Sequence, residues 1–354
     1  MFGLFKKNKE LVGIDIGSSS VKLVQLWQAK DGYHLLNVGI APLPPEAIVD
    51  NSLMDSGAVA DALKNLVASM GIKTKDAVCS ISGNAVIIRK ILVPTMTSEE
   101  LEDQIAWEAE QYIPFDIKDV HLDFQVLGPD AIDPGKMQVL LVASKKDIIQ
   151  DYSAVFADAG LNLAVMDVDG FALQNAWEIN NTDFSGRVLA LVNVGASVIN
   201  INIVKDDTSL FTRDIQTGGN LYTEEIQKQL GVTAEEAESM KILSAELVKQ
   251  PLRDVMSRVN DTVAQEVRRS IDFYNSTAAN EDDRVVGVCL SGGGSKTTGL
   301  REAVQERLGM EVSLLNPFSA IQYNEKDIDP EYLQEIAPLM AVCVGLAIRR
   351  VGDK

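Results

Sequence analysis

Histidine and cysteine are scarce in this chain of 354 residues. It has two histidines, His34 and His121, and three cysteines, Cys79, Cys289 and Cys343. The histidines have no partner at the spacing that zinc ligands or a histidine-based catalytic triad need. The cysteines lie far apart within apolar runs, as buried thiols in a reducing compartment do. Composition therefore argues against a zinc site, a catalytic triad and a disulfide framework.

Positive charge is also in short supply, because 32 lysines and arginines face 51 acids and the formal net charge is −19. A non-specific grip on nucleic acid or on anionic lipid needs a cationic surface, so neither partner is expected. No signal peptide is visible, and the apolar run 337–348 is shorter than the ~20 residues that span a bilayer. We expect a cytoplasmic protein. Residues 1–9, with large apolar side chains before three lysines, are compatible with a membrane interface, a partner contact or a frayed terminus.

The order of predicted elements indicates a duplicated α/β fold. Two meanders of apolar strands, each followed by helices, are expected at 10–17, 20–28 and 32–41 and again at 187–194, 198–204 and 210–215. The repeat and the chain length imply two β-sheet domains with a cleft between them. A final apolar helix at 335–350 is expected to pack on the first half.

The pattern of residues 86–167 indicates a separate module. The expected order is β-α-β-β-α-β, which is that of a ferredoxin-like unit, with helices at 97–112 and 146–159 and a last strand at 161–168. Such an inserted module is more often a docking surface than a catalytic part.

Three glycine-bearing turns follow apolar strands and carry the chemical signal. They are Gly17-Ser18-Ser19 after Asp15, Gly195-Ala196-Ser197 after Asn193, and Gly292-Gly293-Gly294-Ser295. Backbone N–H groups in such turns can cap phosphates, and Asp15 can hold Mg²⁺ through water. One turn alone is as compatible with a plain hairpin or loop. Three in this order predict a nucleotide clamp made by two similar halves.

The three turns resemble the nucleotide motifs of the actin and FtsA superfamily. The segments Gly218–Thr223, Ala237–Lys241, Trp107–Asp116 and Ala337–Arg349 extend the likeness over the chain and make it similar to the PilM family of type IV pilus assembly proteins. The resemblance implies actin-like (ribonuclease H-like) duplicated domains around a nucleotide cleft. It divides the chain into domain 1 (1–85, 168–186 and 335–354), the inserted module (86–167) and domain 2 (187–334).

By the same resemblance the cofactor is ATP or ADP with Mg²⁺. The first turn and Lys22 would hold the β- and γ-phosphates, Asp15 the metal, and the second turn the phosphates from the other domain. The remaining expected contacts, to ribose and adenine, are Gly218, Gly219, Glu238, Lys241, Gly292, Gly293, Gly294 and Ser295. Lys241 is also compatible with a solvated helix face, since its helix is rich in acids.

Asn193 departs from the pattern, because many relatives carry an aspartate at this point of the second turn. An amide keeps the shape but loses the charge that helps to bind metal and order water, so hydrolysis is expected to be weak or absent while binding survives. Asp169, at the start of a helix, is an alternative group to orient water, or simply a helix-start acid.

The resemblance also implies partners. The cytoplasmic tail of a PilN-like inner-membrane protein would dock between the module and domain 1. Motor and platform proteins of the pilus machine would be further partners, and the protein would be held at the inner membrane through these partners. The candidate groove residues, which are equally compatible with a module core, are Ile87, Ile91, Leu101, Ile105, Tyr112, Ile113 and Phe115. The alternatives are an FtsA-like filament-forming protein and a small-molecule kinase, for which no acidic base beside a substrate pocket is recognisable.

Overall fold

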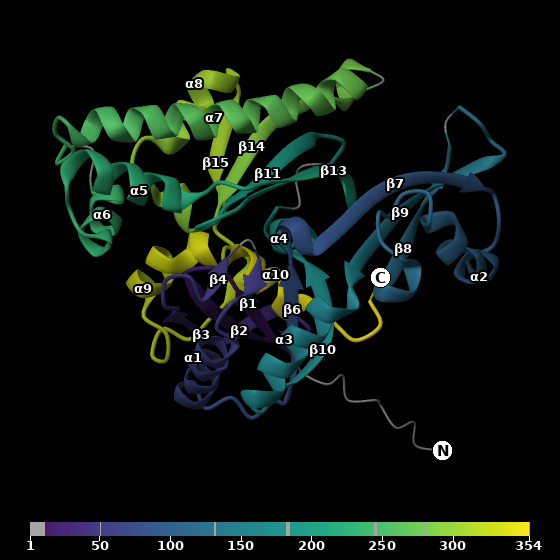
Figure 1. Ribbon diagram of the computed structural model, residues 1–354, viewed down its shortest axis with the longest axis horizontal. Helices are drawn as coiled ribbons and strands as arrows, with labels where there is room; N and C mark the ends of the chain where they lie inside the picture. Colours follow the sequence, from purple (N-terminus) through teal and green to yellow (C-terminus); the bar gives the residue numbers. More distant parts are fainter. Residues whose placement is uncertain are drawn as a thin grey trace.

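Two mixed β-sheets form the body of the protein (Figure 1). A computed structural model describes residues 11–49, 51–130, 132–181, 185–243, 246–278 and 280–353, so the expectation for residues 1–9 lies outside the described residues. The first sheet has the order β10-β6-β1-β2-β3-β16, with β1 at Val12–Ile16, β2 at Ser20–Ala29, β3 at Gly32–Pro42, β6 at Asp76–Ile81, β10 at Asn162–Val168 and β16 at Ile321–Gln322. The second has the order β13-β12-β11-β14-β15, with β11 at Val188–Val194, β12 at Ile199–Lys205, β13 at Thr208–Ile215, β14 at Val285–Ser291 and β15 at Glu311–Leu314.

The two sheets repeat the same hairpin, as the sequence predicts. Strands β1 and β2 pair antiparallel with Asp15 opposite Lys22, and β11 and β12 pair with Asn193 opposite Asn200. Each turn is closed in the same way: Gly17 N donates to Ser20 O at 3.0 Å, and Gly195 N donates to Val198 O at 2.9 Å. The duplicated actin-like architecture is confirmed at this level.

Helices α4 (Asp169–Asn180) and α10 (Ala341–Ile348) lie between the sheets and join them in one apolar cluster that includes Val78, Leu173, Leu191 and Leu346. Their backbones touch, because a Cβ built on Gly345 would lie 1.7 Å from the carbonyl oxygen of Ala172. Only glycine allows that approach.

The expected single helix at 335–350 is divided. It runs as α9 (Pro330–Ile336), a 3-10 turn (Ala337–Met340) and α10. Pro338 cannot donate an N–H to a continuous helix, and its carbonyl instead accepts from Gly292 N at 2.7 Å. The 19 residues Pro330–Ile348 have the length and mean hydropathy (1.4) of a membrane span, but 61% of the apolar window is buried inside the fold. Its burial against the first sheet identifies it as a core segment.

The outer faces of the sheets are covered by the remaining helices. On the first sheet α1 (Ser56–Ser69) packs against α3 (Lys146–Asp158), with Leu63 and Phe156 fully buried, beside the short hairpin of β4 (Ile48–Val49) and β5 (Ser52–Leu53). The second sheet carries α5 (Gly219–Leu230), α6 (Ala234–Lys241), α7 (Leu252–Thr277) and α8 (Leu300–Leu308).

A small module projects from the body, at the right in Figure 1. Its three-stranded sheet has the order β7-β9-β8, with β7 at Val86–Pro94, β8 at Val120–Pro129 and β9 at Lys136–Lys145, and α2 (Ser98–Ala109) covers one face. Thr97 caps α2 as expected, because its side chain accepts from Glu100 N and the Glu100 carboxylate accepts from Thr97 N.

The predicted extent of this module needs correction. The order of elements over 86–167 is as predicted, but β10 pairs in parallel with β6 in the six-stranded sheet, and α3 packs on α1 rather than on the module. Strand β16, expected within domain 2, likewise pairs with β3. Element order is the same whether the last helix and strand return to the small sheet or join the large one, so sequence patterning does not decide between them.

Candidate functional site

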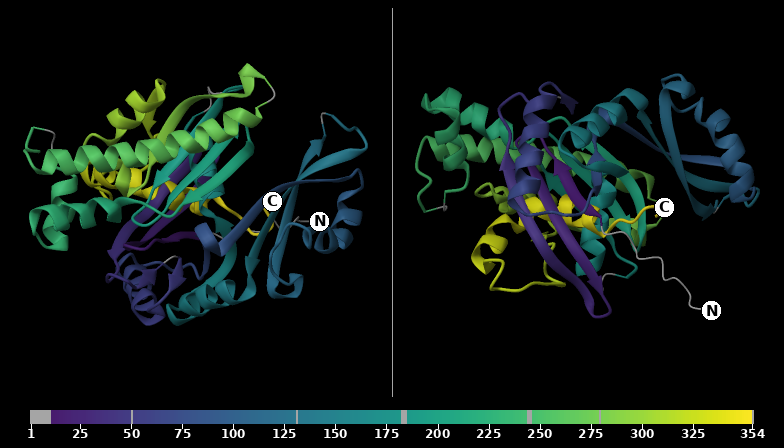
Figure 2. Two further views of the ribbon diagram at one scale, coloured as in Figure 1. Left: turned by 45° about the horizontal axis from the view of Figure 1, so that its top comes forward. Right: turned by 90° about the horizontal axis from the view of Figure 1, so that it is seen from below.

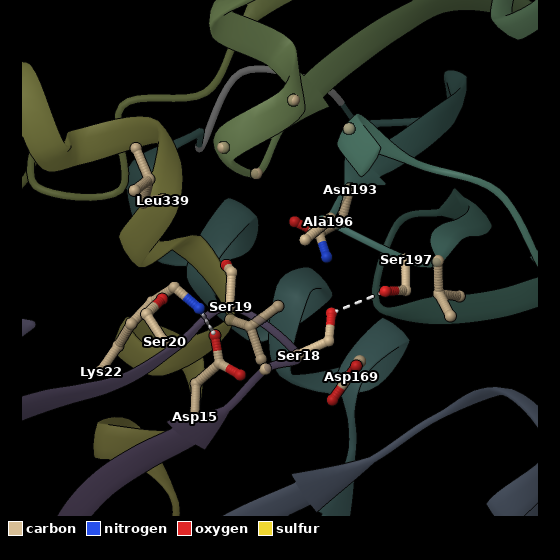
Figure 3. A pocket seen from close by; sticks show the side chains of 18 of the residues that line it. Asp15, Ser18, Ser19, Ser20, Lys22, Asp169, Asn193, Ala196, Ser197 and Leu339 are labelled. Atoms are coloured by element: carbon tan, nitrogen blue, oxygen red, sulfur yellow. Dashed lines mark hydrogen bonds and ion pairs between the residues drawn. The ribbon is translucent and has the colours of Figure 1, made fainter. Parts of the chain in front are cut away.

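The three glycine turns meet at one cavity of about 320 Å³ between the two sheets (Figure 3). The predicted residues that line it are Asp15, Gly17, Ser18, Ser19, Lys22, Asp169, Asn193, Gly195, Ala196, Ser197, Gly219, Glu238, Lys241, Gly292, Gly293 and Gly294. Gly218 and Ser295 do not line it. A Cβ on Gly218 would lie 2.5 Å from Gly195 O, and the Ser295 hydroxyl donates to Gly292 O at 2.7 Å, so both shape the turns from behind.

The first turn places an ion pair in the cavity. Lys22 Nζ lies 2.9 Å from Asp15 Oδ2, with only 12% and 14% of the two side chains exposed. Burial lowers the pKa of Lys22, but the charge and hydrogen bond of Asp15 outweigh it and hold that pKa above its ordinary value. The lysine is therefore a fixed cation that can face a phosphate.

The second turn carries an uncharged pair at the same place. Asn193 Nδ2 donates to Asn200 Oδ1 at 3.0 Å, and Asn200 Nδ2 donates to Asp214 Oδ1 at 2.8 Å. The other oxygen of Asp214 accepts from Gly83 N, at the root of β7. Hydrogen bonds thus run from the cavity wall to the base of the projecting module.

The two halves touch across the cavity. The hydroxyl of Ser197 donates to Ser18 Oγ at 2.9 Å, and this bond joins the tips of the two turns (Figure 3). Asn220 Nδ2 donates to Ser197 Oγ at 3.1 Å and steadies the second tip.

Asp169 lies at the start of α4 and reaches the same cavity. Ser80 Oγ donates to its Oδ1 at 2.6 Å. Burial, then the negative charge of Asp15, raise the pKa of Asp169 to about 6. A carboxyl with that pKa can exchange a proton near neutral pH, which is the property required of a group that orients or deprotonates water.

Lys241 is a buried residue, so the solvated-face alternative is wrong. It is 7% exposed and its ammonium donates to Gly219 O at 3.1 Å, Thr223 Oγ1 at 2.9 Å and Glu238 Oε1 at 2.7 Å. Glu238 keeps about half of its side chain exposed (54%) toward the cavity mouth. The lysine fixes the glutamate, which is left free to accept from a ligand hydroxyl.

The cavity includes polar side chains that sequence patterning does not identify: Asn51, Tyr152, Asn200, Asn220 and Lys296. Asn200 could have been found from its register opposite Asn193, and Asn220 from its place after Gly219. Asn51 and Tyr152 come from distant segments and carry no local signal.

The predicted partner groove is wrong for most of its residues. Ile91, Leu101, Ile105 and Ile113 are at most 6% exposed and form the core between α2 and the small sheet. Ile87 packs against the same cluster, while Tyr112 and Phe115 are more than a third exposed at the end of α2. The helical stripe is explained by packing, which was the open alternative.

A different cavity, of about 380 Å³, lies where the module meets the body. Its walls come from β8 and β9 on one side and from β10, α4, the start of β13 and Arg349 on the other. Figures 1 and 2 show the C-terminal segment ending beside the module at this junction.

Comparison with known proteins identifies the family. The family model described as type IV pilus assembly protein PilM matches residues 13–351. A solved PilM-PilN type IV pilus biogenesis complex contains a chain 31% identical, with a TM-score of 0.86 over 97% of this chain and 99% of that one. Cell division protein FtsA of Streptococcus pneumoniae is 21% identical over 86% of this chain and 75% of its own length. MreB5 of Spiroplasma citri, solved with AMPPNP, shares the fold at 12% identity and a TM-score of 0.52, over 95% of this chain and 94% of that one.

The site and the comparisons agree. Two actin-like halves close on a cavity built from paired glycine turns, and the similarity extends through the projecting module to the last helix. The chain belongs to the PilM family of type IV pilus assembly proteins.

Proposed function

We propose that this protein is an ATP-binding adaptor of the type IV pilus assembly machine, which holds the cytoplasmic tail of a PilN-type inner-membrane protein. The observation that supports it most is the meeting of three glycine turns from two duplicated halves at one cavity. In the same proposal, the protein links this tail to motor and platform proteins and is held at the inner membrane by its partners.

The nucleotide would lie in the cavity with its phosphates against the two joined turn tips. Lys22, the hydroxyls of Ser18 and Ser197, and the turn N–H groups are donors suited to phosphate oxygens. Asp15 is the carboxylate suited to Mg²⁺, through water, while Glu238 suits a ribose hydroxyl. Within the described ranges no group of three or more His, Cys, Asp or Glu side chains could hold a metal alone, so nucleotide oxygens would complete the coordination.

Turnover is expected to be slow. The amide of Asn193 supplies no negative charge for metal or water, and its amide group is held by Asn200 and Ser291. Asp169 is the one carboxyl we assign to water activation, on the basis of its position and raised pKa. The activity is that of an ATP-dependent adaptor with at most weak ATPase.

A calorimetric titration of the MgATP-loaded protein with the N-terminal cytoplasmic tail peptide of its PilN-type partner tests the adaptor proposal. We expect micromolar affinity, weakened about tenfold by Phe171→Ala, which removes a ring from the cavity at the module junction. Tyr332→Ala, on the exposed surface of α9 and outside both cavities, is the matched control and is expected to leave affinity unchanged.

Three results would contradict the proposal. The first is the absence of tail binding by a folded, nucleotide-loaded sample. The second is ATP-dependent sedimentation with a concentration threshold, which would favour the filament-forming alternative. The third is sugar-stimulated ATP turnover, which would favour a kinase.

A further inference from the structure

Gly83 is the residue at which the chain leaves the first sheet and enters the projecting module. It follows Ser82, which lines the cavity at the glycine turns, and it begins the short 3-10 turn before β7. Its φ is +59°, and a Cβ built on it would lie 2.6 Å from Asn51 Nδ2 and 3.0 Å from Gln216 Nε2. The left-handed conformation and the lack of space both favour glycine. The entrance to the module is therefore enclosed from both halves of the fold, by Asn51 of the first and Gln216 of the second.

One carboxylate, that of Asp214 on β13, joins this entrance to the second glycine turn. Asp214 Oδ2 accepts a hydrogen bond from Gly83 N, and Asp214 Oδ1 accepts from Asn200 Nδ2 at 2.8 Å. Asn200 Oδ1 in turn accepts from Asn193 Nδ2 at 3.0 Å, and both asparagines line the cavity. Because Gly83 belongs to the first half and Asp214 to the second, the bond between them holds the two halves together at the entrance.

The charge of Asp214 determines which way the two amides point. An ionised carboxylate only accepts hydrogen bonds, whereas an asparagine side chain has a donor end and an acceptor end. Asn200 therefore turns its NH₂ group to Asp214 and its oxygen to Asn193. Asn193 then turns its NH₂ group to Asn200, which leaves its oxygen beside the third turn, where the Ser291 hydroxyl donates to it at 3.4 Å. The second turn thus offers an acceptor at this place.

This orientation bears on MgATP. Magnesium bound to a nucleotide usually keeps several of its waters, and those waters donate hydrogen bonds. The oxygen of Asn193 is suited to such a donor, and its NH₂ group is not. The phosphates would contact turn tips of both halves, at Ser18 and Ser197, so bound MgATP would favour the arrangement in which Gly83 meets Asp214.

We propose that Asp214 is a positioning residue that couples MgATP binding to the entrance of the module. One of its oxygens fixes the acceptor that the second turn offers to metal-bound water, and the other holds the Gly83 amide. The coupling is reciprocal: MgATP strengthens the bond to Gly83, and loss of that bond weakens MgATP by the same factor. The inference rests on the proposed nucleotide binding and adds the route by which it reaches the module.

Hydrogen exchange measures this bond directly, because the Gly83 N–H is itself the donor. Exchange at Gly83 is followed by residue-resolved mass spectrometry on the full-length protein, without nucleotide and with saturating MgATP. MgATP affinity is measured by calorimetry on the same sample. We expect MgATP to slow exchange at Gly83 about tenfold.

Asp214→Asn separates the two tasks of the carboxylate. The variant keeps an oxygen for the Gly83 N–H but presents an NH₂ group to Asn200, which reverses both amides of the second turn. MgATP affinity should fall about tenfold, while exchange at Gly83 in the nucleotide-free protein stays within about twofold of the native rate. A purely structural role would change the two measurements together.

The double variant Asp214→Asn, Asn200→Asp exchanges the carboxylate and the amide and provides the rescue. It again places an acceptor opposite Asn193, so affinity should return to within about threefold of native. Asp254→Asn, on the exposed surface of α7 and outside the cavity, is the matched control and should change neither measurement. If Asp214→Asn fails to fold, as judged by thermal unfolding, the exchange measurement on the native protein decides alone.

Three results would overturn the inference and leave nucleotide binding intact. They are equal exchange at Gly83 with and without MgATP in a sample that binds it, native affinity in Asp214→Asn, and a double variant that binds no better than the single one. A native protein that does not bind MgATP would overturn the proposed function as well, so the two failures are distinguishable.

Discussion

The two turn hairpins of the cavity have the same backbone and different chemistry. In both, the residue two before the glycine faces a cross-strand partner and is hydrogen-bonded to it, at 2.9 Å for Asp15 with Lys22 and at 3.0 Å for Asn193 with Asn200. The first pair is charged and the second is not. The first turn hairpin can thus neutralise phosphate and hold metal, whereas the second turn hairpin offers only dipoles.

This difference separates binding from turnover. A cation, a carboxylate and turn N–H groups suffice to hold MgATP, but hydrolysis gains from a second acid near the metal and the attacking water. The duplicated geometry provides the place for that acid, and Asn193 occupies it. Substitutions in the two turns test whether the charge difference between them has these consequences.

Lys22→Met should be the most damaging change. It leaves Asp15 as a buried carboxylate without its cation, which costs about 3–5 kcal/mol of unfolding free energy. Asn200→Ala, at the matching place, removes two hydrogen bonds made by an uncharged side chain, to Asn193 and to Asp214, and should cost about 1–3 kcal/mol. Urea unfolding of both variants measures the difference, and equal losses would contradict the distinction between the two pairs.

The double variant Asp15→Asn, Lys22→Asn makes the first pair a copy of the second and serves as the control. It should retain most of the native stability, because no uncompensated charge remains, and should lose MgATP binding measured by calorimetry.

Asp169→Asn should stabilise the nucleotide-free protein at pH 7. The folded state raises the pKa of this carboxyl to about 6, so ionised Asp169 disfavours folding above that pH, and the penalty fades as the pH falls toward the unfolded value near 4. We expect a gain of about 1–3 kcal/mol at pH 7 that is mostly absent at pH 4. A pH series of unfolding curves tests the sign, and a gain that grows on acidification would contradict it.

Asn193→Asp restores a carboxylate to the second turn. Facing Asn200 Oδ1 and close to other acids, it should cost about 1–2 kcal/mol without ligand, and this loss should be recovered with MgATP. Phosphate release should rise about tenfold. If the unfolding free energy of the ATP-loaded variant is the same with and without Mg²⁺, the second turn does not approach the metal.

Ser197→Ala should have the smallest effect. It removes the bond between the turn tips, which is partly exposed, at about 0.5–1 kcal/mol. Ser18→Ala should reduce the unfolding free energy by a similar amount. The double variant should lose little more than either single variant, because all three remove the same hydrogen bond. Additive losses in a double-mutant cycle would show that each serine has another role.

Local patterning was sufficient where a residue's role is set by its neighbours in sequence. The glycine turns after apolar strands, the cap of α2 at Thr97 and the stop of α3 at Gly160 all lie where predicted. The nucleotide cavity could be anticipated because its turns recur in order. By contrast, the stripe of Leu101, Ile105 and their neighbours is equally compatible with a groove and a core. Helical periodicity indicates that one face of the helix is covered, but it does not identify whether a partner or the protein's own sheet covers it.

Local patterns are sufficient to predict the duplicated hairpins, the elements of the module and the residues of the three turns, because these depend on spacing and on backbone preferences of nearby residues. Long-range packing alone establishes that β10 and β16 join the first sheet, that Lys241 is buried, and that Asp167 pairs with Arg349 beside β8. These outcomes depend on contacts between segments far apart in the chain, whose free energies are set by which surfaces are left to cover once the large sheets have formed.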